Sequence, residues 1–436
     1  MAFLIKTIQF LAALFIMVGI HELGHLLFAK LFKMRVNSYM IGFPPKIFKV
    51  KWGETEYALG SIPLGGAVQI AGMVDESLTT DHLQNSPQPW EFRSKPAWQR
   101  LITILGGIAF NLISGILIWI GLTYLIGYTY LPKDEVNKYG IMPNALAIQM
   151  GFKPGDKIIQ INGEDFEDFN DTISPNLLLR SKSYYTIHRD GALLRLPITE
   201  NAIENLSDIK KGLLLRPIYP CVVQSVSPNS SAERAGLMAG DQILALAGQS
   251  TLDIEMLHAI VKTCLGQEVE IVYLRDGVRK STQIQMDEQR LGVALTQPPY
   301  HYKQLNYSFI ASIPVGIAKA LKLMEGQCLS IWKLITGKLS VKKSLSGPIG
   351  IAQSFGNEFI GYRFWMLVAY LSIALGLANL LPIPALDGGH ALCILYETLS
   401  GRKPSDRFLQ IAQKLGMIFI LLLTLYVLGN DISKLL

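Results

Sequence analysis

The sequence predicts a polytopic α-helical membrane protein with four transmembrane helices and a large α+β insertion. Three observations support this prediction. Half of the 436 residues are hydrophobic and only 17% are charged. Apolar runs of membrane-spanning length lie near residues 3–32, 101–126, 365–390 and 411–428. Between about residues 132 and 300 the hydropathy is that of a soluble protein, and this segment repeats itself.

The first apolar segment, residues 1–35, contains the motif His21-Glu22-Leu23-Gly24-His25. Two histidines four positions apart on a helix lie on one face and can hold one metal ion. Glu22 is placed to take a proton from a water bound to that ion. The alternative is a pair of structural histidines bonded to backbone carbonyls. Burial of three polar side chains in hydrocarbon without a partner costs several kcal/mol, which favours the metal.

The charges around this segment predict its orientation. Lys6 stands alone before the apolar run, whereas Lys30, Lys33 and Arg35 follow it. The run is also too long for the core of a signal peptide. By the positive-inside rule the amino terminus faces out, and the histidines lie toward the cytoplasmic end.

Residues 36–74 predict a small antiparallel sheet with strands at 36–41, 46–52, 55–59 and 67–70. An open sheet edge can hold an extended substrate by strand addition. Residues 61–67 are the candidate edge because their glycines allow close backbone approach. The expected substrate contacts are Ile62, Leu64, Gly65, Gly66 and Ala67. The alternative is a cytoplasmic hairpin with no special role.

The second span is predicted within residues 98–130, after a polar, proline-containing cytoplasmic loop at 75–97. Small residues that favour helix packing are Gly106, Gly107, Ser114 and Gly115. Asn111 is the lone amide of this span, and we expect it to make a hydrogen bond within the helical bundle.

The insertion is a duplication. Residues 155–159 (GDKII) match 240–244 (GDQIL), and an R-D-G turn at 189–191 matches one at 275–277, an offset of about 85 residues. A repeat of this size is a domain. Both copies, 131–205 and 206–300, resemble PDZ domains, which bind peptides by strand addition and often capture a carboxylate. Residues 212–215 are the candidate carboxylate loop of the second copy.

The third span is predicted within residues 361–397, after amphipathic helices at 301–360. Pro382 and Pro384 interrupt it, and irregular backbone at this depth requires a buried or wet environment. Since the preceding domains face out, Asp387 lies at the same cytoplasmic depth as His21 and His25. Asp387 is therefore a candidate third zinc ligand, although a D-G-G string alone is more often a turn.

The remaining chain completes the topology. A basic cytoplasmic loop at 398–408 precedes a fourth span at 409–430, so both termini and the duplicated domains are predicted to face out. The net charge is +6, and the basic residues lie beside apolar segments. This pattern suits contact with a bilayer and not with nucleic acid. The four cysteines lack C-x-x-C spacing, which argues against a thiolate zinc site. Cys221 and Cys264 are either bridged or reduced core residues.

Together these motifs resemble the site-2 protease family of intramembrane zinc metallopeptidases, and within it the bacterial branch that regulates sigma-E. The resemblance rests on residues 21–25, the N-x-x-P-x-P-x-L-D-G-G run at 379–389, the PDZ-like pair and L-S-G-P-I-G at 345–350. It implies an enzyme of the bacterial inner membrane that cleaves the transmembrane segments of single-span proteins. The resemblance implies two kinds of substrate. One is an anti-sigma factor of envelope-stress signalling whose outer domain has already been trimmed, and the other is remnant signal peptides.

The resemblance also implies roles for individual parts. Asn379 would position substrate near the zinc, the sheet would be a membrane-reentrant element, and the PDZ pair would act as a size-excluding filter. One departure concerns the second span: the family often has Gly-Pro before its asparagine, and this chain has Gly106-Gly107, so no family role extends to Asn111.

Two other functions are compatible with the residues alone. A non-catalytic membrane scaffold would recruit peptide tails through the PDZ pair, with purely structural histidines. A metal transporter would use the same intramembrane ligands to move the ion.

Overall fold

The computed structural model describes residues 2–73, 86–198, 214–287, 291–296 and 300–435, and it divides into two compact units. The helical unit comprises Met1–Gly127, Asn306–Trp332 and Val341–Leu436. The repeat unit comprises Tyr128–Leu305 and Lys333–Ser340. The soluble insertion predicted from hydropathy is therefore a separate structural unit.

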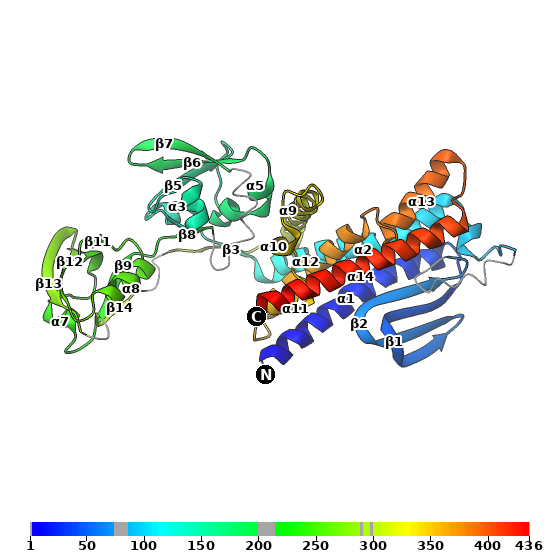
Figure 1. The fold of residues 1–436 in the computed structure, drawn as a ribbon, viewed down its shortest axis with the longest axis horizontal. Coiled ribbons are helices and arrows are strands. Elements are labelled where there is room, and N and C mark those ends of the chain that lie inside the picture. Colours follow the sequence, from blue (N-terminus) through cyan, green and yellow to red (C-terminus); the bar gives the residue numbers. More distant parts are fainter. Residues whose placement is uncertain (1, 74–85, 199–213, 288–290, 297–299, 436) are drawn as a thin grey trace. The chain divides into compact units, whose positions relative to one another are not determined.

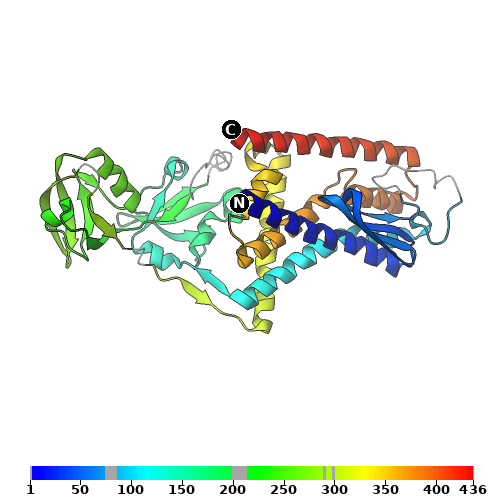
Figure 2. The ribbon, with the colours of Figure 1, turned by 90° about the horizontal axis from the view of Figure 1, so that it is seen from below.

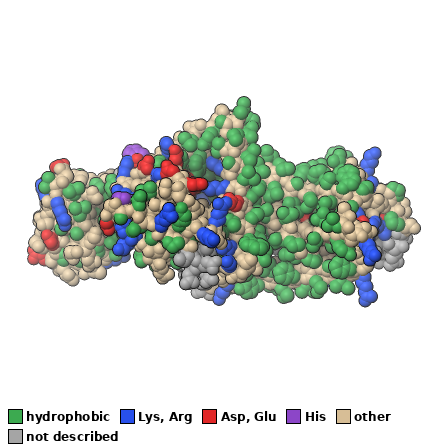
Figure 3. Space-filling model, turned by 90° about the horizontal axis from the view of Figure 1, so that it is seen from above, with side chains coloured by type: hydrophobic (Ala, Val, Ile, Leu, Met, Phe, Trp, Pro, Cys, Tyr) green, Lys and Arg blue, Asp and Glu red, His purple; other side chains and the backbone are tan. Residues whose placement is uncertain are grey.

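Four helices of the helical unit are long and apolar enough to cross a membrane. They are α1 (Ala2–Leu31), α2 (Ala97–Ile126), α12 (Gly361–Asn379) and α14 (Asp406–Leu435). Apolar side chains cover most of the face of this unit seen in Figure 3. Each of these helices overlaps one of the four spans predicted from the sequence, although α12 covers only the first part of the third.

Small residues let α2 approach its neighbours closely. A Cβ atom at Gly24 of α1 would lie 2.3 Å from the carbonyl oxygen of Gly106, and one at Gly115 would lie 2.5 Å from Ile373 of α12. Close backbone approach through small residues is the usual means of packing transmembrane helices. In Figure 2, α1 and α2 converge toward the end of α1 beside the sheet.

The sheet follows α1 and consists of β1 (Val36–Trp52) and β2 (Thr55–Ile70), each longer than the predicted strands. Bulges let each strand pair twice: Tyr39 lies opposite Val68 on one side and Tyr57 on the other. The segments therefore lie in the order 66–70, 36–41, 55–59, 46–52. Segment 66–70 pairs on one side only within the described residues, so it is an edge. The Tyr39 hydroxyl donates to the Gly19 carbonyl (2.9 Å), which holds the sheet along α1 (Figure 1).

The predicted third span is two helices. α12 ends at Asn379, and α13 (Asp387–Ser400) begins after an irregular stretch that contains both prolines. A Cβ atom at Gly388 would lie 2.3 Å from the Leu381 carbonyl oxygen, and one at Gly389 would lie 2.5 Å from that of Ile383. The two glycines after Asp387 are thus required because the preceding backbone passes directly against them.

The segment predicted as amphipathic helices at 301–360 contains α9 (Phe309–Ile335), α10 (Val341–Ser344) and α11 (Pro348–Ser354). Asp431 of α14 accepts hydrogen bonds from the backbone N–H groups of Gly347 and Gly350, at 3.0 and 2.9 Å. These bonds hold the L-S-G-P-I-G turn against the end of α14.

The first repeat contains a three-stranded antiparallel sheet of β5 (Lys157–Ile161), β6 (Tyr184–Arg189) and β7 (Ala192–Pro197). Its other elements are β3 (Tyr128–Tyr130), α3 (Lys133–Asn137), β4 (Ile141–Pro143), α4 (Ala145–Gln149), η3 (Phe169–Ile173) and α5 (Pro175–Leu179). Strand β8 (Leu215–Pro217) pairs with β4, so these residues of the expected second copy join the first. Of the candidate carboxylate loop, residues 212 and 213 lie outside the described chain.

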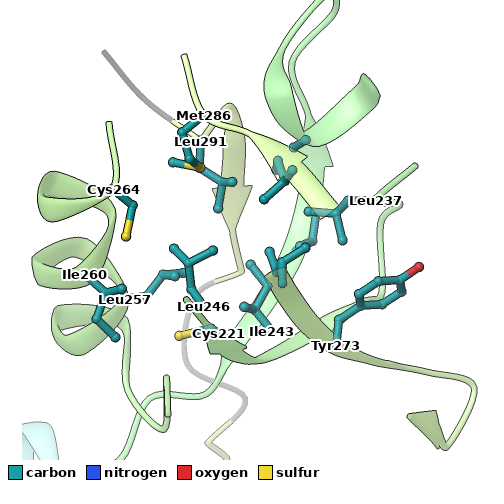
Figure 4. Packing of buried hydrophobic residues seen from close by; sticks show 14 residues of the cluster. Cys221, Leu237, Ile243, Leu246, Leu257, Ile260, Cys264, Tyr273, Met286 and Leu291 are labelled. Atoms are coloured by element: carbon teal, nitrogen blue, oxygen red, sulfur yellow. The ribbon is translucent and has the colours of Figure 1, made fainter. Parts of the chain in front are cut away.

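The second repeat forms a larger sheet with the strand order β13-β12-β10-β9-β14. Its elements are β9 (Cys221–Val226), α7 (Ser231–Arg234), β10 (Gln242–Leu246), β11 (Gln249–Ser250), α8 (Ile254–Thr263), β12 (Glu268–Arg275), β13 (Val278–Gln285) and β14 (Val293–Leu295). β15 (Lys303–Leu305) pairs with β3. Cys221 and Cys264 are buried free thiols at separate places in the core (Figure 4).

One ion pair occurs at the same place in both repeats. Asp156 pairs with Arg189 at 2.6 Å, and Asp241 pairs with Arg275 at 2.7 Å. The same arginines also donate to the carbonyls of Gly151 and Gly236, each at 2.7 Å. The aspartate of the G-D motif and the arginine of the R-D-G motif therefore pair with each other, once in each repeat.

Candidate metal centre

The two motif histidines lie on one face of α1, as their spacing predicts. Both are buried, and their Nε2 atoms are 3.3 Å apart. The rings meet edge to face with centroids 4.8 Å apart. Two imidazole nitrogens therefore point at one small region of space.

Asp387 reaches the same region from the first turn of α13. Its Oδ2 atom lies 3.2 Å from Nε2 of His21 and 3.4 Å from Nε2 of His25. A helix amino terminus favours a carboxylate. The irregular stretch 380–386 allows the chain to turn so that a second helix starts at this depth.

The three residues suit a zinc ion. One ligand atom from each lies within 4.8 Å of the others. Asp387 Oδ2 is buried, and within the described residues it makes no hydrogen bond, since the two nearby Nε2 atoms are only ion-pair contacts. A buried carboxylate oxygen without a donor is costly unless a cation satisfies it. Two imidazoles and one carboxylate are a common protein ligand set for catalytic zinc, which leaves a fourth position open.

The support for both histidines comes from α2. Nδ1 of His25 lies 2.9 Å from the Thr103 carbonyl oxygen, and Nδ1 of His21 lies 3.2 Å from Nδ2 of Asn111. Gly107 lies directly against the rings: a Cβ atom there would be 2.4 Å from Nε2 of His25 and 2.7 Å from Cε1 of His21. Only a glycine leaves room for the two imidazoles at this crossing.

Glu22 is buried beside the histidines and faces the sheet edge. A Cβ atom at Gly66 would lie 2.8 Å from Cγ of Glu22 and 2.9 Å from the Met40 carbonyl oxygen. The absence of a side chain at Gly66 thus brings the edge segment directly against the candidate base.

The structure brings some of the expected substrate residues to the centre and leaves others along the edge. Asn379, at the end of α12, lies with its Nδ2 atom 3.3 Å from Nε2 of His21. Gly65 packs against the Phe43 ring, Ala67 lies opposite Met40, and Ile62 is 44% exposed. The side chain of Leu64 is outside the described part of the structure.

Sequence reasoning missed three features of the centre. The Thr103 carbonyl carries no side-chain signal at all. Gly107 was recognised only as a packing residue. Asn111 does make the expected hydrogen bonds within the bundle, to Ser372 at 3.4 Å, but its nearest functional neighbour is His21. A lone amide in an otherwise apolar span was the available signal for this contact.

Comparison with known proteins places the chain among membrane proteases. Peptidase family M50 matches residues 9–423. The regulator of sigma E protease of Haemophilus influenzae is 31% identical, with all of both chains covered. The regulator of sigma-E protease RseP of Salmonella typhimurium (strain 14028s) is 29% identical over 98% of both chains. A Neisseria meningitidis protein named "Putative zinc metalloprotease" is 28% identical over 98% of this chain and 99% of its own.

Proposed function

The chain belongs to peptidase family M50, and from this premise we propose that it is a zinc endopeptidase that cuts peptide bonds within transmembrane segments of single-span proteins. One observation carries the proposal. Three ligand atoms of His21, His25 and Asp387 converge within 4.8 Å inside a unit built from four apolar helices. Ionisable groups at such a depth are retained for function, since their burial is costly.

His21, His25 and Asp387 would hold the zinc ion. When bound, zinc acts as a Lewis acid on water and on the scissile carbonyl. Glu22 takes the proton of the attacking water and later returns it to the leaving amine, as general base and then general acid. Asn379, beside His21, is placed to orient the substrate backbone near the ion.

The sheet edge would hold the substrate extended. A helix hides its carbonyl groups, so a transmembrane substrate must unwind before cleavage. Among the described residues, segment 66–70 pairs on one side only, and the contact of Gly66 with Glu22 supports delivery of an added strand to the base. Ile62, Leu64, Gly65, Gly66 and Ala67 are the proposed substrate contacts. Substrates whose spans contain helix-weakening residues would be preferred.

The relatives support a more specific role. Two of them are named regulators of sigma E, so we place this enzyme in regulated intramembrane proteolysis of an anti-sigma factor. Remnant signal peptides are a second substrate class. We place the protein in the bacterial inner membrane, with both termini and the two PDZ-like repeats outside and the metal centre toward the cytoplasmic side. The repeats would exclude substrates with bulky outer domains.

The test is cleavage of a model single-span substrate by purified protein in detergent. Glu22→Gln should lower the rate by about 10² to 10⁴-fold, the usual contribution of general acid–base catalysis, while zinc binding is kept. Glu54→Gln is the matched control, because Glu54 lies at the exposed turn of the sheet and pairs with Lys30.

Full cleavage by the Glu22→Gln protein would refute the mechanism. If the Glu22→Gln protein loses zinc as well as activity, Glu22 is needed to form the metal site and not for proton transfer. A substrate panel with and without a folded outer domain tests the filter: only the trimmed forms should be cut.

A further inference from the structure

The two zinc-facing histidines differ in what holds their outer ring nitrogen. Both Nδ1 atoms face α2 and both Nε2 atoms face Asp387. His25 contacts the backbone carbonyl oxygen of Thr103, which can only accept a hydrogen bond. His21 contacts the side-chain amide of Asn111, which can donate or accept. The tautomer of His25 is therefore set by the backbone, and that of His21 depends on one side chain.

We propose that Asn111 is a positioning residue that prepares His21 for zinc through its amide oxygen. This proposal rests on the proposed function above. A neutral imidazole that binds a metal through Nε2 carries its proton on Nδ1, and that N–H needs an acceptor. Asn111 is completely buried, so water does not replace it.

The amide can present its oxygen without moving the helix. Nδ2 of Asn111 is the atom 3.2 Å from Nδ1 of His21, and Oδ1 lies 3.4 Å from Oγ of Ser372. A half-turn about the Cβ–Cγ bond exchanges these two nearly isosteric atoms. Oδ1 then accepts from Nδ1–H of His21, and the amide N–H group donates to the Ser372 hydroxyl.

Ser372 is suited to this exchange because its hydroxyl can accept and donate at once. It lies on α12, is 1% exposed, and also contacts the backbone carbonyl of Asn111 at 3.1 Å and the Ser114 hydroxyl at 2.9 Å. The amide therefore has a partner in either orientation. Metal binding selects the orientation with the oxygen toward His21, since only that one leaves the Nε2 lone pair free.

The chain offers variants that separate this role from ordinary packing. Asn111→Asp keeps the size and, when ionised, provides only acceptors, whereas Asn111→Leu keeps the size and provides none. Thr123→Val is the matched control in the same helix. It removes a buried hydroxyl that has no hydrogen-bond partner within the described residues.

The experiment measures zinc affinity by competition with a chelator, on full-length protein in detergent, together with the visible absorption of the Co²⁺-substituted protein. Asn111→Leu should bind zinc about 10 to 100-fold more weakly, the usual effect of losing an outer partner of a metal-bound histidine. Asn111→Asp should bind zinc within about threefold of the parent or more tightly, and Thr123→Val should leave zinc affinity unchanged. The Co²⁺ spectrum should shift in Asn111→Leu alone.

Two outcomes would overturn the proposal. If Asn111→Asp loses as much affinity as Asn111→Leu, the residue is only a packing contact. If Asn111→Leu binds like the parent, no outer acceptor is needed. Failure of the proposed function looks different, because the parent protein itself would then bind no zinc, or would bind it equally well after His25→Ala.

Discussion

Two aspartates, one in each unit, have opposite surroundings. Asp241 of the repeat unit accepts from Nε and Nη2 of Arg275 at 2.7 and 2.8 Å and from the Met238 N–H at 2.8 Å. Each of its oxygens is satisfied by the protein. Asp387 of the helical unit has an oxygen that makes no hydrogen bond in the described part of the chain, with two imidazole nitrogens beside it. The protein itself neutralises the first carboxylate, whereas the second is placed to bind a cation.

The comparison extends to the duplication. Asp156 repeats the bonding of Asp241, with Arg189 and the Lys153 N–H as donors. A charge that is neutralised within its own domain can be copied with that domain. The candidate metal centre takes its ligands from α1 and α13 and further contacts from α2 and α12, so it depends on how these helices pack together. The role of an aspartate in the interior therefore depends on which hydrogen-bond donors surround its carboxylate.

The largest expected effect separates the two aspartates directly. Asp387→Asn should weaken zinc binding by more than about 100-fold, because loss of a ligand exceeds the 10 to 100-fold cost of losing an outer partner. Asp241→Asn should leave zinc affinity unchanged but destabilise the repeat unit, since Arg275 loses its charged partner. Chelator competition and hydrogen exchange of β10 and β12 measure the two effects. Equal zinc loss in both variants would contradict the distinction.

A smaller effect concerns how tightly α2 packs on the centre. Gly107→Ala should lower zinc affinity at least tenfold and cleavage by about 10²-fold, because a methyl group displaces the imidazoles and small misplacements are costly. Gly121→Ala is the matched control in the same helix, where a Cβ atom meets nothing within 4 Å. If both variants bind zinc and cleave substrate like the parent, neither property depends on the absence of a side chain at Gly107.

The smallest effect is a pH dependence confined to the repeat unit. Burial opposes ionisation of Asp241, but hydrogen bonds from Arg275 and the Met238 N–H outweigh it and hold the pKa below its ordinary value. Burial is likewise outweighed at Asp253 by Arg216 and by the N–H groups of Tyr219 and Glu255, so its pKa is also lowered. A depressed folded pKa means that the unfolded chain binds more protons in acid.

This stability is therefore complete above the unfolded pKa of about 4 and is lost as the pH falls through the folded values. Each aspartate contributes a slope of at most about 1.4 kcal/mol per pH unit. Hydrogen exchange of β10, corrected for the intrinsic rate, should show this loss between about pH 5 and pH 3. Asp253→Asn should reduce the slope. An identical slope in the variant would show that other groups cause the acid sensitivity.

Local patterns predicted much of the structure. The spacing of His21 and His25 placed both on one helix face, and hydropathy located the four apolar helices. The matching G-D and R-D-G strings predicted a duplication, although their meeting in one ion pair was not foreseen. The sheet edge near Gly66 was predicted from its glycines, and its contact with Glu22 was not. Strand lengths were underestimated because bulges let β1 and β2 continue through Gly42, Pro44 and Gly60.

By itself the sequence determined which side chains have metal and base chemistry, because residue type and helical period are local properties. Through the count of spans it also predicted that Asp387 lies at the level of His21 and His25, and the structure places these three side chains together. Only the tertiary structure decided that α13 starts at Asp387, that Gly107 makes room for two rings, and that Asn111 faces His21. Those contacts join residues far apart in the chain. They follow from how closely the helices pack, which no local pattern encodes.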